Sequence, residues 1–207
     1  ELVSAPRLDN ITSVEACLQG IIASSAKAQE LSGIRLAAFF DNEEIGSRTK
    51  QGAGSGILLE VLERIYLALG YDREAMWQAV SGGFMLSVDV AHALHPNYGE
   101  KYDPYTRPVL NGGVTLKQAA SQSYAGDAQA VAIIKALCQQ EGIPCQMFVN
   151  HADQLGGSTL GSIASALVPM RTMDVGVAML SMHSARETMG AADQQALNEL
   201  ISKFYTV

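Results

Sequence analysis

The chain has 207 residues, of which 48% are hydrophobic and 17% are charged, a composition typical of a globular protein with one sizeable core. Its formal net charge of -7 argues against a general nucleic-acid binder, because phosphate binding requires a basic surface. No apolar run approaches the roughly 18 residues of a membrane span, so none is expected. Cys17, Cys138 and Cys145 lack CxxC spacing, which predicts reduced thiols in a cytoplasmic protein.

The first part of the chain predicts helices around one buried strand. Thr12 and Glu15 have the spacing of a capping box, which predicts that a helix begins with Thr12 as its N-cap. Its predicted apolar face consists of Val14, Cys17, Leu18, Ile21 and Ile22. The apolar run 34–40 predicts a strand of a parallel sheet. A helix over 57–69 follows, and Asp72 is placed to cap another short helix.

Strands and helices continue to alternate after this point. The predicted strands are 84–90, 114–117, 145–149 and 172–179, and the predicted helices are 127–141, 158–167 and 187–204. Residues 92–113 predict a long loop, a feature that is often functional. The alternation predicts an α/β domain with a mixed, mostly parallel sheet and helices on both faces. Because the chain opens on ELVSAPRLDN, we expect it to be a piece of a longer protein whose sheet is incomplete.

Acidic residues and one histidine follow the predicted strands. In open α/β sheets ligands bind beyond the carboxyl ends of the strands, where Asp9, Glu43, Glu44, Asp89 and His183 are expected. These side chains are typical ligands of zinc, manganese or cobalt. Adjacent carboxylates in a turning segment point to different sides, so one of the Glu pair can bind metal while the other takes a proton from water.

Four motifs carry a resemblance to a known family. The segments DNEEIGSRTKQGAGS, SVDVAHALHPNY, GGSTLGSIAS and DVGVAMLSMHSARE resemble the M18 metallo-aminopeptidases, the aspartyl aminopeptidase and aminopeptidase I group. The match runs from SAPRLDN to the last predicted helix. The resemblance implies a zinc-peptidase-like fold and a two-metal enzyme that removes the N-terminal residue of a peptide substrate.

The resemblance also implies a role for each acidic residue. Asp9 would bridge two divalent ions, expected to be zinc, with manganese or cobalt as alternatives. Glu44 and His183 would complete the coordination of one ion, and Asp89 would be a ligand of the other. Glu43 would be the catalytic general base. Two dications would also neutralise the acidic cluster of Asp41, Glu43 and Glu44 that follows the predicted strand 34–40.

Three further residues are implied on the substrate side. His92 would hold the substrate or the tetrahedral intermediate, Lys117 would lie in the substrate pocket, and Tyr124 would lie near it. The preferred N-terminal residue stays open among acidic, apolar and other types, although the charge of Lys117 favours acidic ones.

The chain departs from the family pattern in one respect. The family has an upstream catalytic segment that supplies a histidine to the second ion, and an inserted dimerisation domain; neither is expected in residues 1–207. The Asp89 ion would then lack a ligand, and an unpaired sheet edge would favour association. In a complete protein we expect a homo-oligomer without nucleic-acid or membrane partners.

Two other functions are alternatives to a two-metal aminopeptidase. A fragment or paralogue without activity would serve a structural or assembly role. A two-carboxylate glycosidase would use Glu43 and Asp89 and leave His183 without a role. The GGST run at 156–159 lacks the lysine of a P-loop and is expected to be a pocket wall. Nothing specifies a serine hydrolase, and His95 and His151 are expected to be structural.

Overall fold

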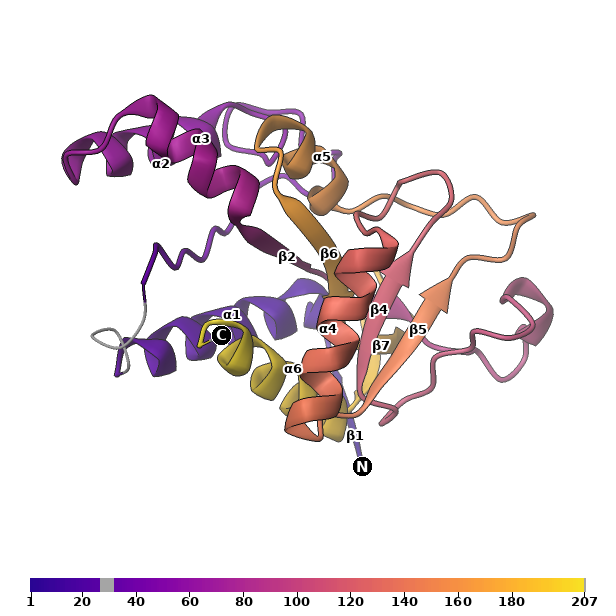
Figure 1. Cartoon of the computed structure of the whole chain (residues 1–207). Coiled ribbons are helices and arrows are strands. Elements are labelled where there is room, and N and C mark those ends of the chain that lie inside the picture. Colours follow the sequence, from indigo (N-terminus) through magenta and orange to yellow (C-terminus); the bar gives the residue numbers. More distant parts are fainter. Residues whose placement is uncertain (27–31, 207) are drawn as a thin grey trace.

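The computed structural model describes residues 1–26 and 32–206, which form an α/β fold (Figure 1). The helices in these residues are α1 (Leu8–Ser25), α2 (Ile57–Ala68), α3 (Arg73–Gly82), η1 (Gly99–Lys101), α4 (Ala128–Glu141), α5 (Leu160–Leu167) and α6 (Ala191–Phe204). The strands are β1 (Leu2–Ala5), β2 (Phe84–Val88), β3 (Ala91–His92), β4 (Val114–Gln118), β5 (Cys145–Val149), β6 (Arg171–Gly176), β7 (Ala178–Leu180) and β8 (Glu187–Gly190).

The prediction was of one mixed, mostly parallel sheet; the α/β class and the mixed character are confirmed, but the strands form two sheets with as many antiparallel as parallel pairs of strands. Their orders are β1-β8-β7-β3 and β2-β6-β4-β5. Both are mixed: β3–β7, β2–β6 and β4–β5 are parallel pairs, while β1–β8, β7–β8 and β4–β6 are antiparallel. The predicted strand 172–179 is divided between them, because β6 belongs to one sheet and β7 to the other. An apolar run shows that a strand is buried, but it does not identify the partner strand.

Helices cover both faces of the sheet that contains β6, as predicted. Successive side chains of a strand point to opposite faces. Met173 and Val175 belong to the main apolar core, together with residues of α4 and α6. Asp174, on the other face of β6, contacts Gly161 of α5. Asp174 is fully buried and accepts hydrogen bonds from the Ser87 hydroxyl and the Ala125 N–H, which fixes the loop before α4.

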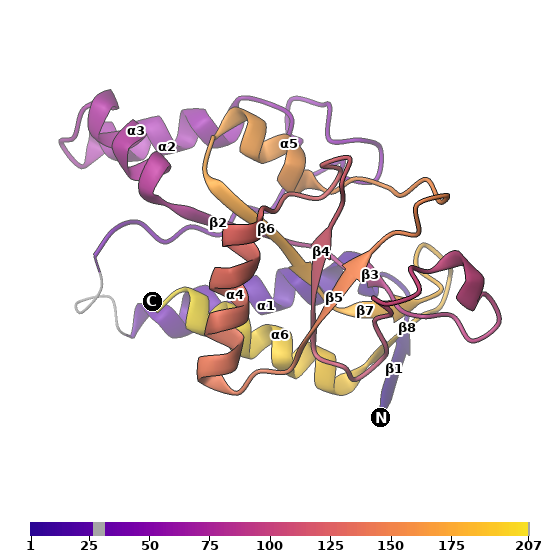
Figure 2. The same cartoon turned by 45° about the vertical axis from the view of Figure 1, so that its right-hand side comes forward.

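Helix α1 packs along α6 through small residues (Figures 1 and 2). The buried residues that recur every four positions are Thr12, Ala16, Gly20 and Ser24. A Cβ at Gly20 would lie 2.6 Å from the Ile201 side chain, so only glycine permits this approach. Val14 and Leu18, which were predicted for the buried face, are exposed. The close approach of the two helices therefore requires small side chains on this face of α1. A pattern of apolar residues does not reveal such a requirement.

The start of α1 also differs from the prediction. The helix begins at Leu8, and the Thr12 hydroxyl donates to the Leu8 carbonyl, so Thr12 is not the N-cap. The backbone of Asp9 and Asn10 departs from helical φ and ψ, which interrupts the first turn. Glu15 accepts a hydrogen bond from Gln194 instead of closing a capping box.

Segment 34–40 is not a strand, contrary to the prediction. It has no ladder partner among the residues described, and it lies beside an apolar cavity of about 900 Å³ that is also lined by β2, α4 and the end of α6. The Leu36 carbonyl accepts a hydrogen bond from the Tyr205 hydroxyl. A buried strand needs an apolar sequence and also the free edge of a neighbouring strand to pair with. Segment 34–40 has the apolar sequence but no such partner among the residues described.

Several local predictions were confirmed. Asp72 caps α3 as predicted, by accepting the N–H of Ala75, and the helix predicted over 127–141 is α4, which Asp127 caps by accepting the N–H of Ala130. The predicted last helix is shorter, because its first four residues form β8. The cysteines in the described residues are free. Within residues 1–26 and 32–206 there is no helix of the length and apolarity needed to cross a bilayer.

Candidate metal centre

Separate turns carry the predicted ligands to one place in the fold. Asp9 lies at the start of α1, shortly after β1, and His183 lies in the turn between β7 and β8. Glu43 and Glu44 lie in the turn after segment 34–40, and Asp89 follows β2 directly. These positions agree with the expectation of ligands at strand ends, although segment 34–40 is not itself a strand.

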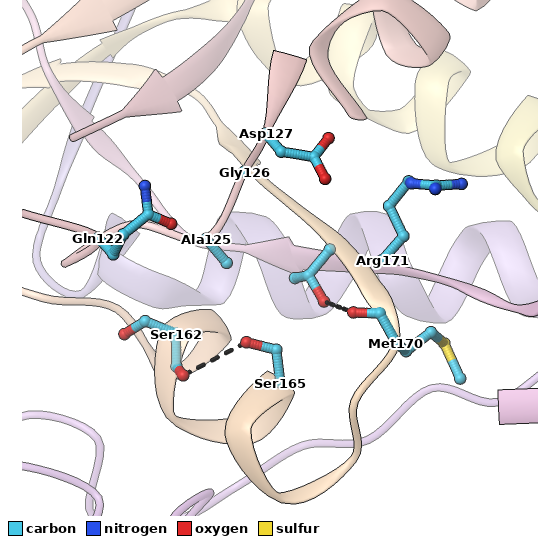
Figure 3. Close-up of a pocket in the computed structure, with 9 residues that line it drawn as sticks. Gln122, Ala125, Gly126, Asp127, Ser162, Ser165, Met170 and Arg171 are labelled. Atoms are coloured by element: carbon cyan, nitrogen blue, oxygen red, sulfur yellow. Dashed lines mark hydrogen bonds between the residues drawn. The ribbon is translucent and has the colours of Figure 1, made fainter. Parts of the chain in front are cut away.

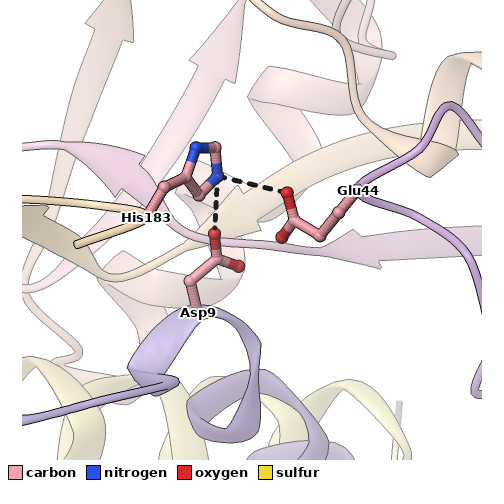
Figure 4. Close-up of side chains that lie close together, drawn as sticks. All are labelled: Asp9, Glu44 and His183. Atoms are coloured by element: carbon pink, nitrogen blue, oxygen red, sulfur yellow. Dashed lines mark ion pairs between the residues drawn. The ribbon is translucent and has the colours of Figure 1, made fainter. Parts of the chain in front are cut away.

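Three of these side chains form a compact donor cluster (Figure 4). The Nε2 atom of His183 is 3.1 Å from Asp9 Oδ2 and 3.3 Å from Glu44 Oε2. The three donor atoms all lie within 4.8 Å of one another. The Asp9 side chain is 5% exposed, whereas those of Glu44 and His183 are 58% and 62% exposed. The cluster is therefore anchored on its inner side and open to solvent on its outer side.

The electrostatics of Asp9 show how crowded the carboxylates are. Burial, followed by the negative charges of Asp89, Glu44 and Glu187, raises the pKa of Asp9 to about 7 in the metal-free chain, although His183 acts in the opposite direction. A divalent cation among these groups would remove the repulsion. One imidazole nitrogen and two carboxylate oxygens are a donor set that zinc accepts. The residues present therefore fit a metal ion.

Glu43 lies in the same electrostatic environment but outside the donor cluster. Burial is the first cause that raises its pKa to about 7, followed by the charges of Asp89, Glu44 and Asp9, and Lys117 acts in the opposite direction. A carboxylate with a pKa near neutrality can both accept and return a proton at pH 7. This property is what a general base requires.

Asp89 is close to the cluster yet bound to other groups. Its Oδ2 atom is 3.3 Å from the Lys117 ammonium, and its Oδ1 atom accepts the N–H of Val90. Lys117 is 1% exposed, and it also donates to the Val90 carbonyl at 2.9 Å. The lysine predicted for the substrate pocket is therefore buried beneath Asp89, where its charge acts on that carboxylate.

The three residues predicted for the substrate side gather around Phe148 of β5. Its ring centroid is 6.0 Å from that of Tyr124 and 6.4 Å from that of His92, and the Lys117 ammonium lies 5.0 Å from the centre of the Tyr124 ring. Loss of solvent, Lys117 and His183 lower the pKa of His92, so its ring is neutral at pH 7. Phe148 was not predicted, because an aromatic residue in a strand is ordinarily part of the core.

Glu187 is a second residue near the site that sequence reasoning missed. It is 2% exposed, and its two oxygens accept the N–H groups of Asp9 and His183. His183 has φ of 67°, a left-handed conformation that costs a non-glycine residue roughly 1–3 kcal/mol and needs support from its surroundings. Glu187 was predicted as the first residue of the helix 187–204. An acidic residue is common in the first turn of a helix, so its position gave no sign of a role in the site.

The remaining residues of interest have local partners. The Nδ1 atom of His95 accepts the N–H of Asn97, and that of His151 accepts the N–H of Asp153. Both rings thus stabilise their own turns, in agreement with a structural role. The Ser184 hydroxyl likewise accepts a nearby backbone N–H.

A separate pocket of about 220 Å³ lies between α5, the start of β6 and the loop before α4 (Figure 3). None of the predicted site residues lines it. Its charged side chains have structural partners, since Asp127 caps α4 and Arg171 donates to Gln129 at 2.8 Å. The donor cluster, and not this pocket, is the candidate functional site.

Curated proteins resemble the chain over its whole length. It is 44% identical over 207 residues to the probable M18 family aminopeptidase 2 of Clostridium acetobutylicum, an alignment that covers 100% of this chain and 47% of that protein. It is 41% identical over 204 residues to the protein of the same name from Streptomyces coelicolor, covering 99% and 47%. The chain thus spans about half the length of these curated relatives.

Solved structures and a family model agree with this. A chain of the structure described as the cryo-EM structure of the Ape4 and Nbr1 complex superposes with a TM-score of 0.95 at 38% identity, covering 99% of this chain and 39% of that one. A chain of the S. cerevisiae mApe1 dodecamer gives a TM-score of 0.76 at 29% identity, covering 99% and 46%. The model described as aminopeptidase I zinc metalloprotease (M18) matches residues 1–205. The chain therefore belongs to the M18 family of aminopeptidases.

Proposed function

We propose that the chain is part of the catalytic domain of a two-metal aminopeptidase, which hydrolyses the peptide bond after the N-terminal residue of a peptide. The main support is the convergence of Asp9, Glu44 and His183 beside Glu43 in a chain of the M18 family. Because the chain spans about half the length of its curated relatives, the activity is proposed for a longer protein with further catalytic strands and a dimerisation domain.

The proposed metal is zinc, with manganese or cobalt as alternatives. Asp9, Glu44 and His183 would hold one ion, and Asp89 with a share of Asp9 would hold the other. Two bound ions polarise the scissile carbonyl and lower the pKa of water toward about 7. The description of the family as zinc metalloproteases supports this choice of metal.

The side chains around the cluster would carry the proton transfers. Glu43 would take a proton from the attacking water and return it to the leaving amine, because it is a carboxylate beside the donor cluster that is not itself one of the three donors. His92 is neutral at pH 7, so its single N–H can donate to the carbonyl oxygen as negative charge develops there. Tyr124 and Phe148 are 6% and 2% exposed, so they would support the substrate side from beneath, where the ring of Phe148 lies beside that of His92.

We also propose a preference for acidic N-terminal residues. Lys117 is the one buried cation among residues 1–26 and 32–206. Its hydrogen bonds to Asp89 and Val90 and its 1% exposure leave no direct contact with a substrate, so the preference rests on the positive charge that Lys117 places beneath the site.

The proposed longer protein is a cytoplasmic homo-oligomer. The free cysteines and the absence of a membrane-spanning helix in the described residues are compatible with this location. The dodecamer named for mApe1 supports the oligomer. The outer edge of β2 and the apolar cavity beside it would favour association of the 207-residue chain.

The function is tested by assaying the longer protein with zinc on peptides that differ only in a free or an acetylated N-terminus. An aminopeptidase cleaves the first and spares the second. Zinc binding without any cleavage would instead support the alternative, a family member that serves an assembly role. Cleavage of both peptides would contradict an aminopeptidase.

The raised pKa values predict how the metal-free chain responds to pH. The pKa of Asp9 rises from 3.8 to about 7 and that of Glu43 from 4.5 to about 7, so the folded state binds more protons than the unfolded state between these values. Their contribution to stability is present at about pH 4 and lost as pH rises through about 7. We expect thermal unfolding in a chelator to show this loss, and added zinc to reverse it with release of protons. A pH-independent zinc affinity would contradict the prediction.

Substitution of Lys117 tests the proposed substrate preference. In the longer protein we expect Lys117→Met to reduce kcat/KM on Asp- and Glu-starting peptides more than on a Leu-starting peptide, because the substitution removes the positive charge beneath the site that attracts an acidic side chain. Parallel assays of the three peptides measure the ratio. Equal losses would contradict the preference and would assign Lys117 to the support of Asp89, its partner at 3.3 Å.

A further inference from the structure

Glu187 lies at the end of the sheet where the chain leaves β1 toward Asp9 and leaves β7 toward His183. It is the first residue of β8, the strand between β1 and β7. Ala5, the last residue of β1, pairs with Glu187, and Leu180, the last residue of β7, pairs with Thr188. The chain leads from β1 to Asp9 and from β7 to His183, so both ligands begin beside this glutamate.

The carboxylate of Glu187 joins the two segments directly. Its Oε2 atom accepts the N–H of Asp9 at 2.9 Å, and its Oε1 atom accepts the N–H of His183 at 2.7 Å. The side chain is 2% exposed, so water does not compete for these bonds. His183 has positive φ, and the bond to Glu187 fixes its backbone in that conformation.

We propose that Glu187 is a positioning residue that sets the relative placement of Asp9 and His183 before metal binds. The inference rests on the proposed metal centre and deepens it. Only a side chain with two acceptor atoms can serve both N–H groups. Glutamine has the same shape, but its NH₂ group donates, so it would oppose one of the two backbone donors.

The chain contains a matched control at the other end of the same strand. Asp193 in the first turn of α6 is fully buried, and its oxygens accept the N–H groups of Asn111 and Gly113, each at 2.8 Å. Asp193→Asn therefore removes the same kind of bond as Glu187→Gln, from another buried carboxylate that accepts backbone N–H groups, and it does so away from the ligands.

The experiment titrates wild-type chain, Glu187→Gln and Asp193→Asn with zinc against a chromophoric chelator. We expect about 10–100-fold weaker zinc binding for Glu187→Gln, the usual effect of losing a residue that orients a ligand. Asp193→Asn should bind zinc as tightly as wild type, even if both variants unfold at a lower temperature. Equal zinc affinity in Glu187→Gln and wild type, or equal weakening in both variants, would overturn the inference.

A second measurement needs neither metal nor a variant. Amide hydrogen exchange of the metal-free wild-type chain should show protection at Asp9 and His183, because their N–H groups are already bonded to Glu187. Exchange of both amides at unprotected rates would overturn the inference. If wild-type chain binds no zinc, the proposed metal centre fails, while the exchange result still decides whether Glu187 holds the two segments.

Discussion

Glu43→Gln in the longer protein is expected to lower kcat by about 10²–10⁴-fold while the zinc content stays that of wild type. The substitution keeps the size of the side chain and removes its basic oxygen. Glu43 lies outside the cluster of three donor atoms, yet it is close enough for the charges of Asp89, Glu44 and Asp9 to act on it, so it can serve as the base without holding the metal. Initial rates on one peptide, together with elemental analysis of zinc, measure both quantities.

Two substitutions in the same segment distinguish the loss of a general base from the loss of metal or of negative charge. Glu44→Gln should lose zinc together with activity, because Glu44 Oε2 belongs to the donor cluster. Asp41→Asn removes one charge from the same acidic segment at an exposed position and should leave both zinc content and kcat near those of wild type. If Glu43→Gln retained wild-type turnover, another group would have to be the base.

Local parts of the fold were predictable from the sequence, and nonlocal parts were not. Asp72 caps a helix as expected, because a cap depends on residues within one turn. The division of 172–179 into β6 and β7 depends on partners elsewhere in the chain, as does the absence of a strand at 34–40. The buried face of α1 was missed for a similar reason, since the close approach of α6 selects glycine at position 20.

The residues whose side chains would bind metal could be predicted from the sequence, whereas the residues that support them could not. Asp9, Glu44 and His183 were named from their residue types, their place at strand ends and a family resemblance, and the structure brings their donor atoms together. Glu187 acts through backbone N–H groups, which leave no pattern in a sequence. The burial of Lys117 was equally hidden, because a lysine in a strand is usually exposed and here a carboxylate from another strand end covers it.

The 207-residue chain alone is expected to bind one zinc ion and to show no turnover above the blank. Asp9, Glu44 and His183 supply three donors to one ion, a number that zinc accepts. In the described residues a second ion would have only Asp89 and a share of Asp9. The Lys117 ammonium, 3.3 Å from Asp89, would also repel it.

Both ions are needed for the proposed chemistry, because two metals would share the activation of water and the stabilisation of the developing charge. A chain with one ion keeps the base Glu43 and the donor His92 but stabilises the transition state at only one side. Native mass spectrometry should therefore find one zinc in wild-type chain and none in His183→Ala, which lacks the imidazole donor of the cluster. Two stoichiometric ions together with cleavage of an aminoacyl substrate would show that Asp89 releases Lys117 and that the described residues suffice for catalysis.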